Sequence, residues 1–75
     1  MRRRLPKYSR VTLTTDRFAD LGASRGAVGY VIEVWPGGKY EVEVSDSTGI
    51  TIAQFVADDD ELELDPQSVD PTPTA

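Results

Sequence analysis

The chain contains no cysteine and no histidine among its 75 residues. Without cysteine there are no disulfides, thiolate metal sites or thiol nucleophiles, and without histidine the commonest general base and transition-metal ligand are missing. No apolar run approaches the roughly 18 residues of a membrane span. We therefore expect a non-enzymatic, cytoplasmic protein that carries no cofactor or metal and does not enter a membrane.

Basic residues are scarce after the N-terminus. The formal net charge is −5, yet residues 1–10 hold five of the eight basic residues and no acidic one. The rest of the chain has three basic residues against all 13 acidic ones, a net charge of −10, and no basic residue follows Lys39. The sequence thus combines a basic arm with an acidic body.

Both ends of the chain have the composition of tails. Residues 1–7 are predicted to form a basic flexible arm that ends near Pro6. Residues 66–75 contain three prolines and only one sizeable apolar side chain, Val69, which predicts a disordered Pro/Thr tail. Residues 8–65 remain for one domain, and a domain of this size buries only about 60% of the surface of its unfolded chain.

Apolar and polar side chains alternate along most of this central region. In residues 39–45, the alternation places Tyr40, Val42 and Val44 inward and Glu41 and Glu43 toward water. The same reasoning predicts strands at about 9–14, 27–35, 39–45, 50–57 and 61–64.

Three further features of the central region point to a small barrel. A long loop follows the first predicted strand, and the turn at residues 58–60 is short enough to hold one 3₁₀ turn. Gly29 is predicted to mark a bend where the second strand passes from one sheet to another. The predicted fold is all-β: a small five-stranded SH3-like antiparallel barrel with flexible N- and C-terminal tails.

Acidic side chains supply the candidate binding residues. The acidic turn, residues 58–63, lacks the alternating ligands and the central glycine of an EF-hand loop. It is therefore expected to bind a basic partner protein rather than a metal ion. Trp35 stands at a hairpin tip, where it is either an exposed interface anchor or half-buried against Tyr8 or Phe18. The predicted partner-binding residues are Trp35, Glu41, Glu43, Asp58, Asp59, Asp60 and Glu61.

Two other motifs bear on nucleic-acid or nucleotide binding. Arg2, Arg3 and Arg4 could contact phosphates, but the acidic body repels nucleic acid, so this is the alternative site. The glycine-rich segment from Gly22 to Gly29 is followed by a predicted strand and not by a helix, whereas phosphate-binding loops precede a helix N-terminus. These glycines are therefore interpreted as turn residues.

Most of the central region resembles a family of short bacterial proteins, of the domain of unknown function 4926 type. The resemblance lies in three segments: Gly22 to Trp35, Gly38 to Val44 and Thr51 to Ala53. It implies an SH3-like barrel, often encoded as a small free-standing protein and sometimes beside toxin-like genes. The chain departs from the family pattern at three positions, namely Ala23, Ala27 and Tyr30.

The segment from Phe55 to Leu64 is also similar, more loosely, to the last strand of accessory barrels in photosystem I and ferredoxin–thioredoxin reductase. The sequence thus predicts a non-catalytic protein–protein interaction module, in its most concrete form a neutraliser (antitoxin-like) of a basic toxin-like enzyme. The alternatives are an accessory subunit of a larger redox complex and nucleic-acid binding through the N-terminal arginines. Homo-oligomerisation through a barrel edge stays open.

Overall fold

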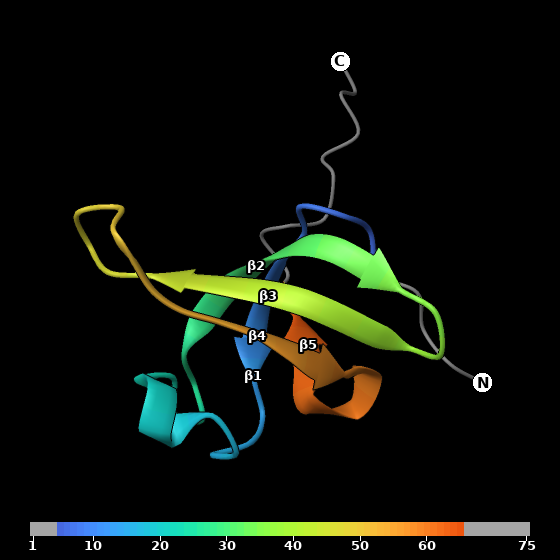
Figure 1. Ribbon diagram of the computed structural model, residues 1–75, viewed down its shortest axis with the longest axis horizontal. Helices are drawn as coiled ribbons and strands as arrows, with labels where there is room; N and C mark the ends of the chain where they lie inside the picture. The colour runs from blue at the N-terminus through green and yellow to red at the C-terminus, as the bar shows by residue number, and fades with distance from the viewer. Residues whose placement is uncertain (1–4, 66–75) are drawn as a thin grey trace.

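The computed structural model describes residues 5–65, and this part of the chain is all-β (Figure 1). The prediction of five strands is confirmed, with each boundary within one or two residues of its expected place. A 3₁₀ helix also forms at the turn before the last strand. The elements are β1 (Arg10–Leu13), η1 (Ala19–Leu21), β2 (Val28–Trp35), β3 (Lys39–Ser45), β4 (Thr51–Asp58), η2 (Asp59–Glu61) and β5 (Leu62–Leu64).

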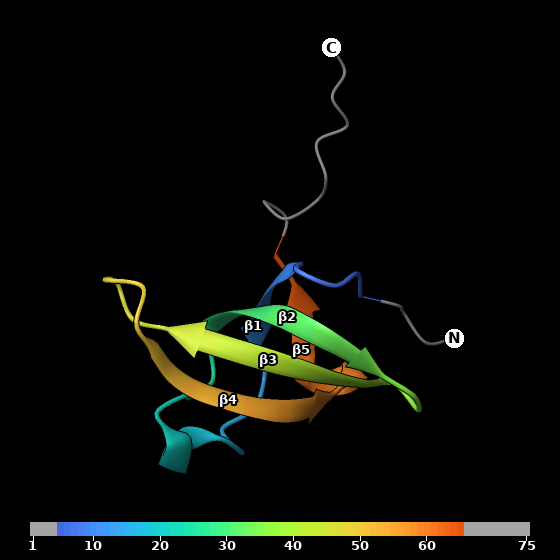
Figure 2. The same ribbon diagram turned by 45° about the horizontal axis from the view of Figure 1, so that its top comes forward.

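The five strands form one antiparallel sheet in the order β4-β3-β2-β1-β5. In Figure 1, β2, β3 and β4 lie side by side as a meander, and β1 and β5 cross behind them at a steep angle. The turned view in Figure 2 shows how strongly the sheet curls. This order is compatible with the predicted SH3-like barrel. No ladder joins β4 to β5 within residues 5–65, so these two strands form the edges of the sheet.

The inner face of the curled sheet holds the hydrophobic core. The alternation predicted for β3 is confirmed, because Tyr40, Val42 and Val44 are buried while Glu41 and Glu43 lie on the other face. The loop after β1 closes one side of this core with an aromatic pair: the Phe18 ring stacks on Phe55 with centroids 3.9 Å apart. Apart from Tyr40, the rest of the core is aliphatic.

The segment before β1 is also packed against the sheet. Leu5 is only 1% exposed and belongs to the core, and its backbone N–H donates to the Tyr40 hydroxyl at 3.1 Å. Lys7 forms an ion pair with Glu33 at 3.1 Å, and Tyr8 takes a left-handed conformation with φ of 72°. Residues 5–7, predicted as part of a flexible arm, are therefore part of the domain, because the burial of Leu5 outweighs the polarity of its neighbours.

Gly29 has a different role from the predicted bend. The register shift in β2 lies between Val31 and Glu33, beyond this glycine. A Cβ atom at Gly29 would lie 2.8 Å from the Glu43 backbone oxygen and 2.9 Å from the Val42 side chain. The glycine is thus required by the close approach of β2 and β3.

The remaining predictions about the ends of the chain fall outside the described residues. These are the disordered tail at 66–75 and the arm residues before Leu5. Within residues 5–65, both helices are single 3₁₀ turns, and neither is long or apolar enough to span a membrane.

Candidate functional site

The side of β2, β3 and β4 that faces away from the core combines exposed aromatic and acidic side chains. Two rows of this face follow from the strand registers: Tyr30, Glu43 and Gln54 are neighbours, and Glu41 lies beside Val56. Tyr30 is 47% exposed and Trp35, near the end of β2, is 46% exposed. We define the outer face by six residues: Tyr30, Trp35, Glu41, Glu43, Gln54 and Val56.

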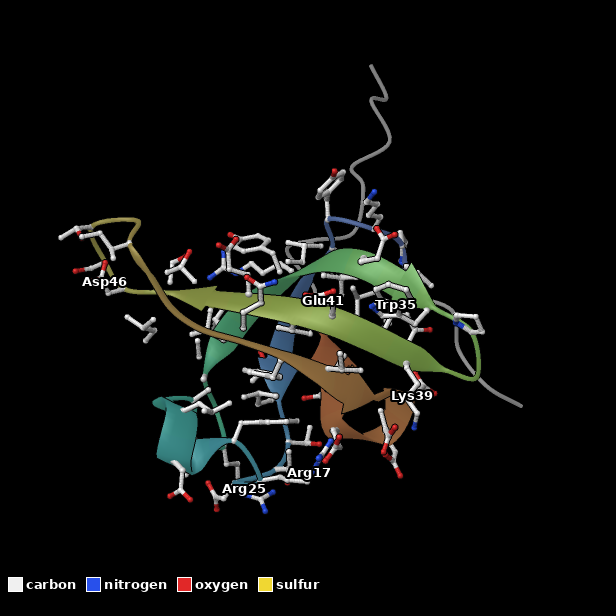
Figure 3. The ribbon with its side chains drawn as sticks, in the orientation of Figure 1. Arg17, Arg25, Trp35, Lys39, Glu41 and Asp46 are labelled. Atoms are coloured by element: carbon white, nitrogen blue, oxygen red, sulfur yellow. The ribbon has the colours of Figure 1, made fainter. Side chains whose placement is uncertain are left out.

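Glu41 joins the three strands of the outer face. One of its carboxylate oxygens, Oε1, accepts a hydrogen bond from the Trp35 indole Nε1 at 3.2 Å, and the other, Oε2, accepts one from Gln54 Nε2 at 2.6 Å. Figure 3 shows Trp35 and Glu41 side by side over β2 and β3. The Trp35 ring is therefore held in one orientation while about half of its surface stays accessible.

The charges of Glu41 and Glu43 are not balanced by a base in the described structure. Within residues 5–65, the Glu43 carboxylate is hydrogen-bonded to the Thr51 hydroxyl, and Glu41 is bonded to the two neutral donors named above. The nearby lysines pair with other acids of the same rows: Lys39, opposite Trp35, pairs with Asp58, and Lys7 pairs with Glu33, which lies opposite Glu41. The outer face thus presents carboxylates that a cationic group could neutralise.

The predicted acidic turn divides into residues with different roles. Asp58 ends β4, where Lys39 pairs with it. The Glu61 carboxylate accepts hydrogen bonds from Arg17 Nε at 2.6 Å and from the Asp58 backbone N–H at 2.8 Å, the latter within a capping box around η2. Its side chain is only 13% exposed, whereas Asp60 stays exposed. Glu61 therefore stabilises the fold and is not available to a partner.

Arg17 is the residue that sequence reasoning missed. It lies 44 positions from Glu61, which it contacts with two nitrogens, and its guanidinium also lies 4.3 Å from the centroid of the Phe18 ring. It holds the loop after β1 against η2. The sequence does contain one signal: Arg17 is one of only three basic residues after Arg10, in a region that is otherwise acidic.

The hydrogen bonds from Arg17 lower the pKa of the Glu61 carboxyl below its ordinary value, although burial opposes this. We expect Glu61→Gln to reduce the free energy of unfolding at pH 7 by about 1 to 2 kcal/mol, because charge-assisted hydrogen bonds are lost. Since the folded pKa is the lower one, the contribution is complete above about pH 5, where the unfolded carboxyl is also ionised, and is lost as the pH falls through the folded value.

Urea unfolding at several pH values measures this effect. The difference in the free energy of unfolding between the wild-type protein and Glu61→Gln should become smaller as the pH falls below about 5. Glu63→Gln, at an exposed position two residues further on, is the matched control and should show almost no gap at any pH. A gap for Glu61→Gln that stays constant down to about pH 2 would contradict the assigned role.

The turn between β3 and β4 is built around a second carboxylate. Asp46 Oδ1 accepts hydrogen bonds from the Thr48 hydroxyl at 2.6 Å, the Thr48 N–H at 2.8 Å and the Ile50 N–H at 3.1 Å. These bonds, led by that from the Thr48 hydroxyl, lower the pKa of Asp46. Figure 3 places Asp46 at the opposite end of the meander from Trp35, so it belongs to the turn and not to the candidate site.

The outer face places an accessible aromatic ring beside carboxylates. Residues 5–65 contain no group of three or more acidic, histidine or cysteine side chains that could hold a metal ion. An accessible indole can bind a cation over its ring, and the adjacent carboxylates can accept hydrogen bonds from a guanidinium or ammonium group. Arg2, Arg3 and Arg4, the alternative nucleic-acid site, lie outside the described residues.

Comparison with known proteins was made at the levels of family, curated sequence and solved structure. Neither the curated proteins nor the solved structures gave a match. The family comparison matches residues 7–64, which cover the sheet from before β1 to the end of β5. The chain therefore belongs to the family described as Domain of unknown function (DUF4926).

Proposed function

We propose that this chain is a non-catalytic protein-interaction module that binds a basic partner protein through its outer face. The observation that carries the proposal is the arrangement around Glu41, which fixes the half-exposed Trp35 ring beside carboxylates that no lysine or arginine of residues 5–65 neutralises. An oriented aromatic ring with acidic neighbours is a suitable anchor for arginine or lysine side chains.

The charge distribution supports a basic partner over a neutral one. The body of the chain carries most of the acidic residues, and Glu41 and Glu43 lie on the same strand face as Trp35. Such a surface accelerates encounter with a positively charged protein and repels other acidic molecules. A basic toxin-like enzyme that the chain neutralises is the partner class that we propose.

Two substitutions on the outer face test this function. Trp35→Ala and Glu43→Lys, used as separate baits in extracts of the native host, should each lose a partner that the wild-type chain retains. With the purified partner, we expect each substitution to weaken binding by roughly tenfold to a hundredfold, as for a central aromatic anchor or a reversed charge. Calorimetric titration at low and at physiological salt measures the loss.

Asp20→Lys provides the matched control for Glu43→Lys. Asp20 is an exposed acid in η1, away from the outer face, so its reversal changes the net charge equally. It should weaken binding only slightly and only at low salt. Equal losses for Asp20→Lys and Glu43→Lys would mean that overall charge, and not the outer face, attracts the partner.

A further inference from the structure

The edge of the sheet at β4 is a second surface available to a partner. Among residues 5–65, β4 pairs with β3 on one side and with no strand on the other, and residues 51–57 carry no charged side chain. Sheet edges are usually protected from other chains by short length, lysine or proline. At eight residues and with neither lysine nor proline, β4 lacks these protections.

The backbone groups that this edge offers can be identified from the ladder with β3. The Asp59 N–H donates to the Gly38 carbonyl at 3.0 Å, and bonded pairs alternate from there along an antiparallel ladder. Gln54 and Val56 therefore point their backbone groups away from β3. In agreement, the Val56 carbonyl faces Arg17 Nη2 at 3.4 Å.

Features at both ends limit how much of the edge can pair. On one side the β3–β4 register shifts between Val44 and Ser45, and on the other Arg17 covers the Val56 carbonyl. The N–H and C=O of Gln54 and the N–H of Val56 remain directed away from the sheet. An added strand would therefore be short and centred on Gln54.

The side chains beside this edge favour a basic segment. A residue added opposite Gln54 projects over the outer face, on which Gln54 lies beside Glu43 and Val56 beside Glu41. Two strand spacings, about 10 Å, separate its backbone from that of either glutamate, which an arginine side chain can bridge. The residues on either side of it project toward the face where Phe55 is buried.

We infer that an extended segment of the basic partner adds to β4 as an antiparallel strand centred on Gln54, with basic and apolar residues alternating. This inference rests on the proposed function and names the conformation that the partner adopts. A second copy of this chain is the less suitable occupant, because it brings the same net charge of −5 to an already acidic face.

A peptide of roughly ten residues that alternates arginine and valine provides the probe. In the inferred antiparallel arrangement, the arginine amides face β4 and the valine amides face away. Fluorescence anisotropy with the full chain compares the parent peptide with two backbone N-methylated forms of the same charge. Methylation at arginine positions should weaken binding about tenfold, and methylation at valine positions should have little effect.

Gln54→Pro and Gln54→Ala provide the corresponding pair of protein variants. Both lose the side-chain bond to Glu41, but only proline removes the N–H that faces the added strand. The ladder with β3 does not use this N–H, so the strand tolerates proline there, as edge strands do. We expect Gln54→Pro to bind the parent peptide about tenfold more weakly than Gln54→Ala.

The outcomes distinguish this inference from the proposed function. Equal binding of both methylated peptides, or no binding of the parent peptide at low salt, would overturn strand addition. The proposed function is judged separately, by Glu43→Lys against Asp20→Lys. A dimer of the free protein that Gln54→Pro abolishes in sedimentation experiments would assign the edge to a second copy and also overturn the inference.

Discussion

Leu5→Ala is expected to lower the free energy of unfolding by about 2 to 4 kcal/mol, although Leu5 is only the fifth residue of the sequence. Its side chain is 1% exposed among the core residues, so truncation removes apolar burial and leaves a cavity. Small domains have a total stability of only about 5 kcal/mol or somewhat more. The thermal midpoint should therefore fall by more than about 10 °C.

Leu21→Ala is the matched control, because Leu21 is the same residue type but 50% exposed in η1. It should change the free energy of unfolding by only about 0.5 kcal/mol. Circular dichroism during urea or thermal unfolding measures both variants. Equal, small effects for Leu5→Ala and Leu21→Ala would show that the segment before β1 does not pack on the sheet in solution.

Gly29→Ala is expected to cost about 2 to 3 kcal/mol of stability. The new methyl group would lie 2.8 Å from the Glu43 backbone oxygen, and a backbone atom can move away only if β3 moves with it. The displacement would reach the outer face, since Glu43 projects from it. We therefore expect Gly29→Ala to weaken partner binding as well as stability.

Gly26→Ala separates this steric effect from the general cost of replacing a glycine. Gly26 has a φ of 92° with open space around the added methyl group, so alanine there meets only the left-handed backbone penalty of about 1 kcal/mol. Urea unfolding should rank Gly29→Ala as the more damaging change. If Gly26→Ala were equally or more destabilising, the close approach of β2 and β3 at Gly29 would be refuted.

The candidate site could be predicted in part from the sequence. The residue types and positions of Trp35, Glu41 and Glu43 predict a binding surface, and the register of β2 and β3 brings them onto one face. What could not be predicted is that the Glu41 carboxylate fixes the indole and also reaches Gln54 across the neighbouring strand. Hydrogen bonds between strands depend on register, which the alternation within one strand does not specify.

The acidic turn illustrates the opposite case. Asp58 and Glu61 have the composition of a binding surface, yet Lys39 and Arg17 already engage them within the domain. Charge runs in a sequence identify acidic residues but do not show which are used internally. Asp60 is the exposed acid of η2, and partner-binding substitutions in this turn should therefore be made there.

By itself, the sequence determined the number and limits of the strands and the inward face of β3, because residues that alternate with a period of two bury one side of a strand. It also determined the segregation of charge, which depends on composition alone. The tertiary structure alone decided that Leu5 enters the core, that Glu61 binds Arg17 and that Glu41 orients Trp35. These contacts join residues 35, 44 and 6 positions apart. Strand register brings the last pair together and the curling of the sheet and its loops the other two, and no pattern within one strand encodes either.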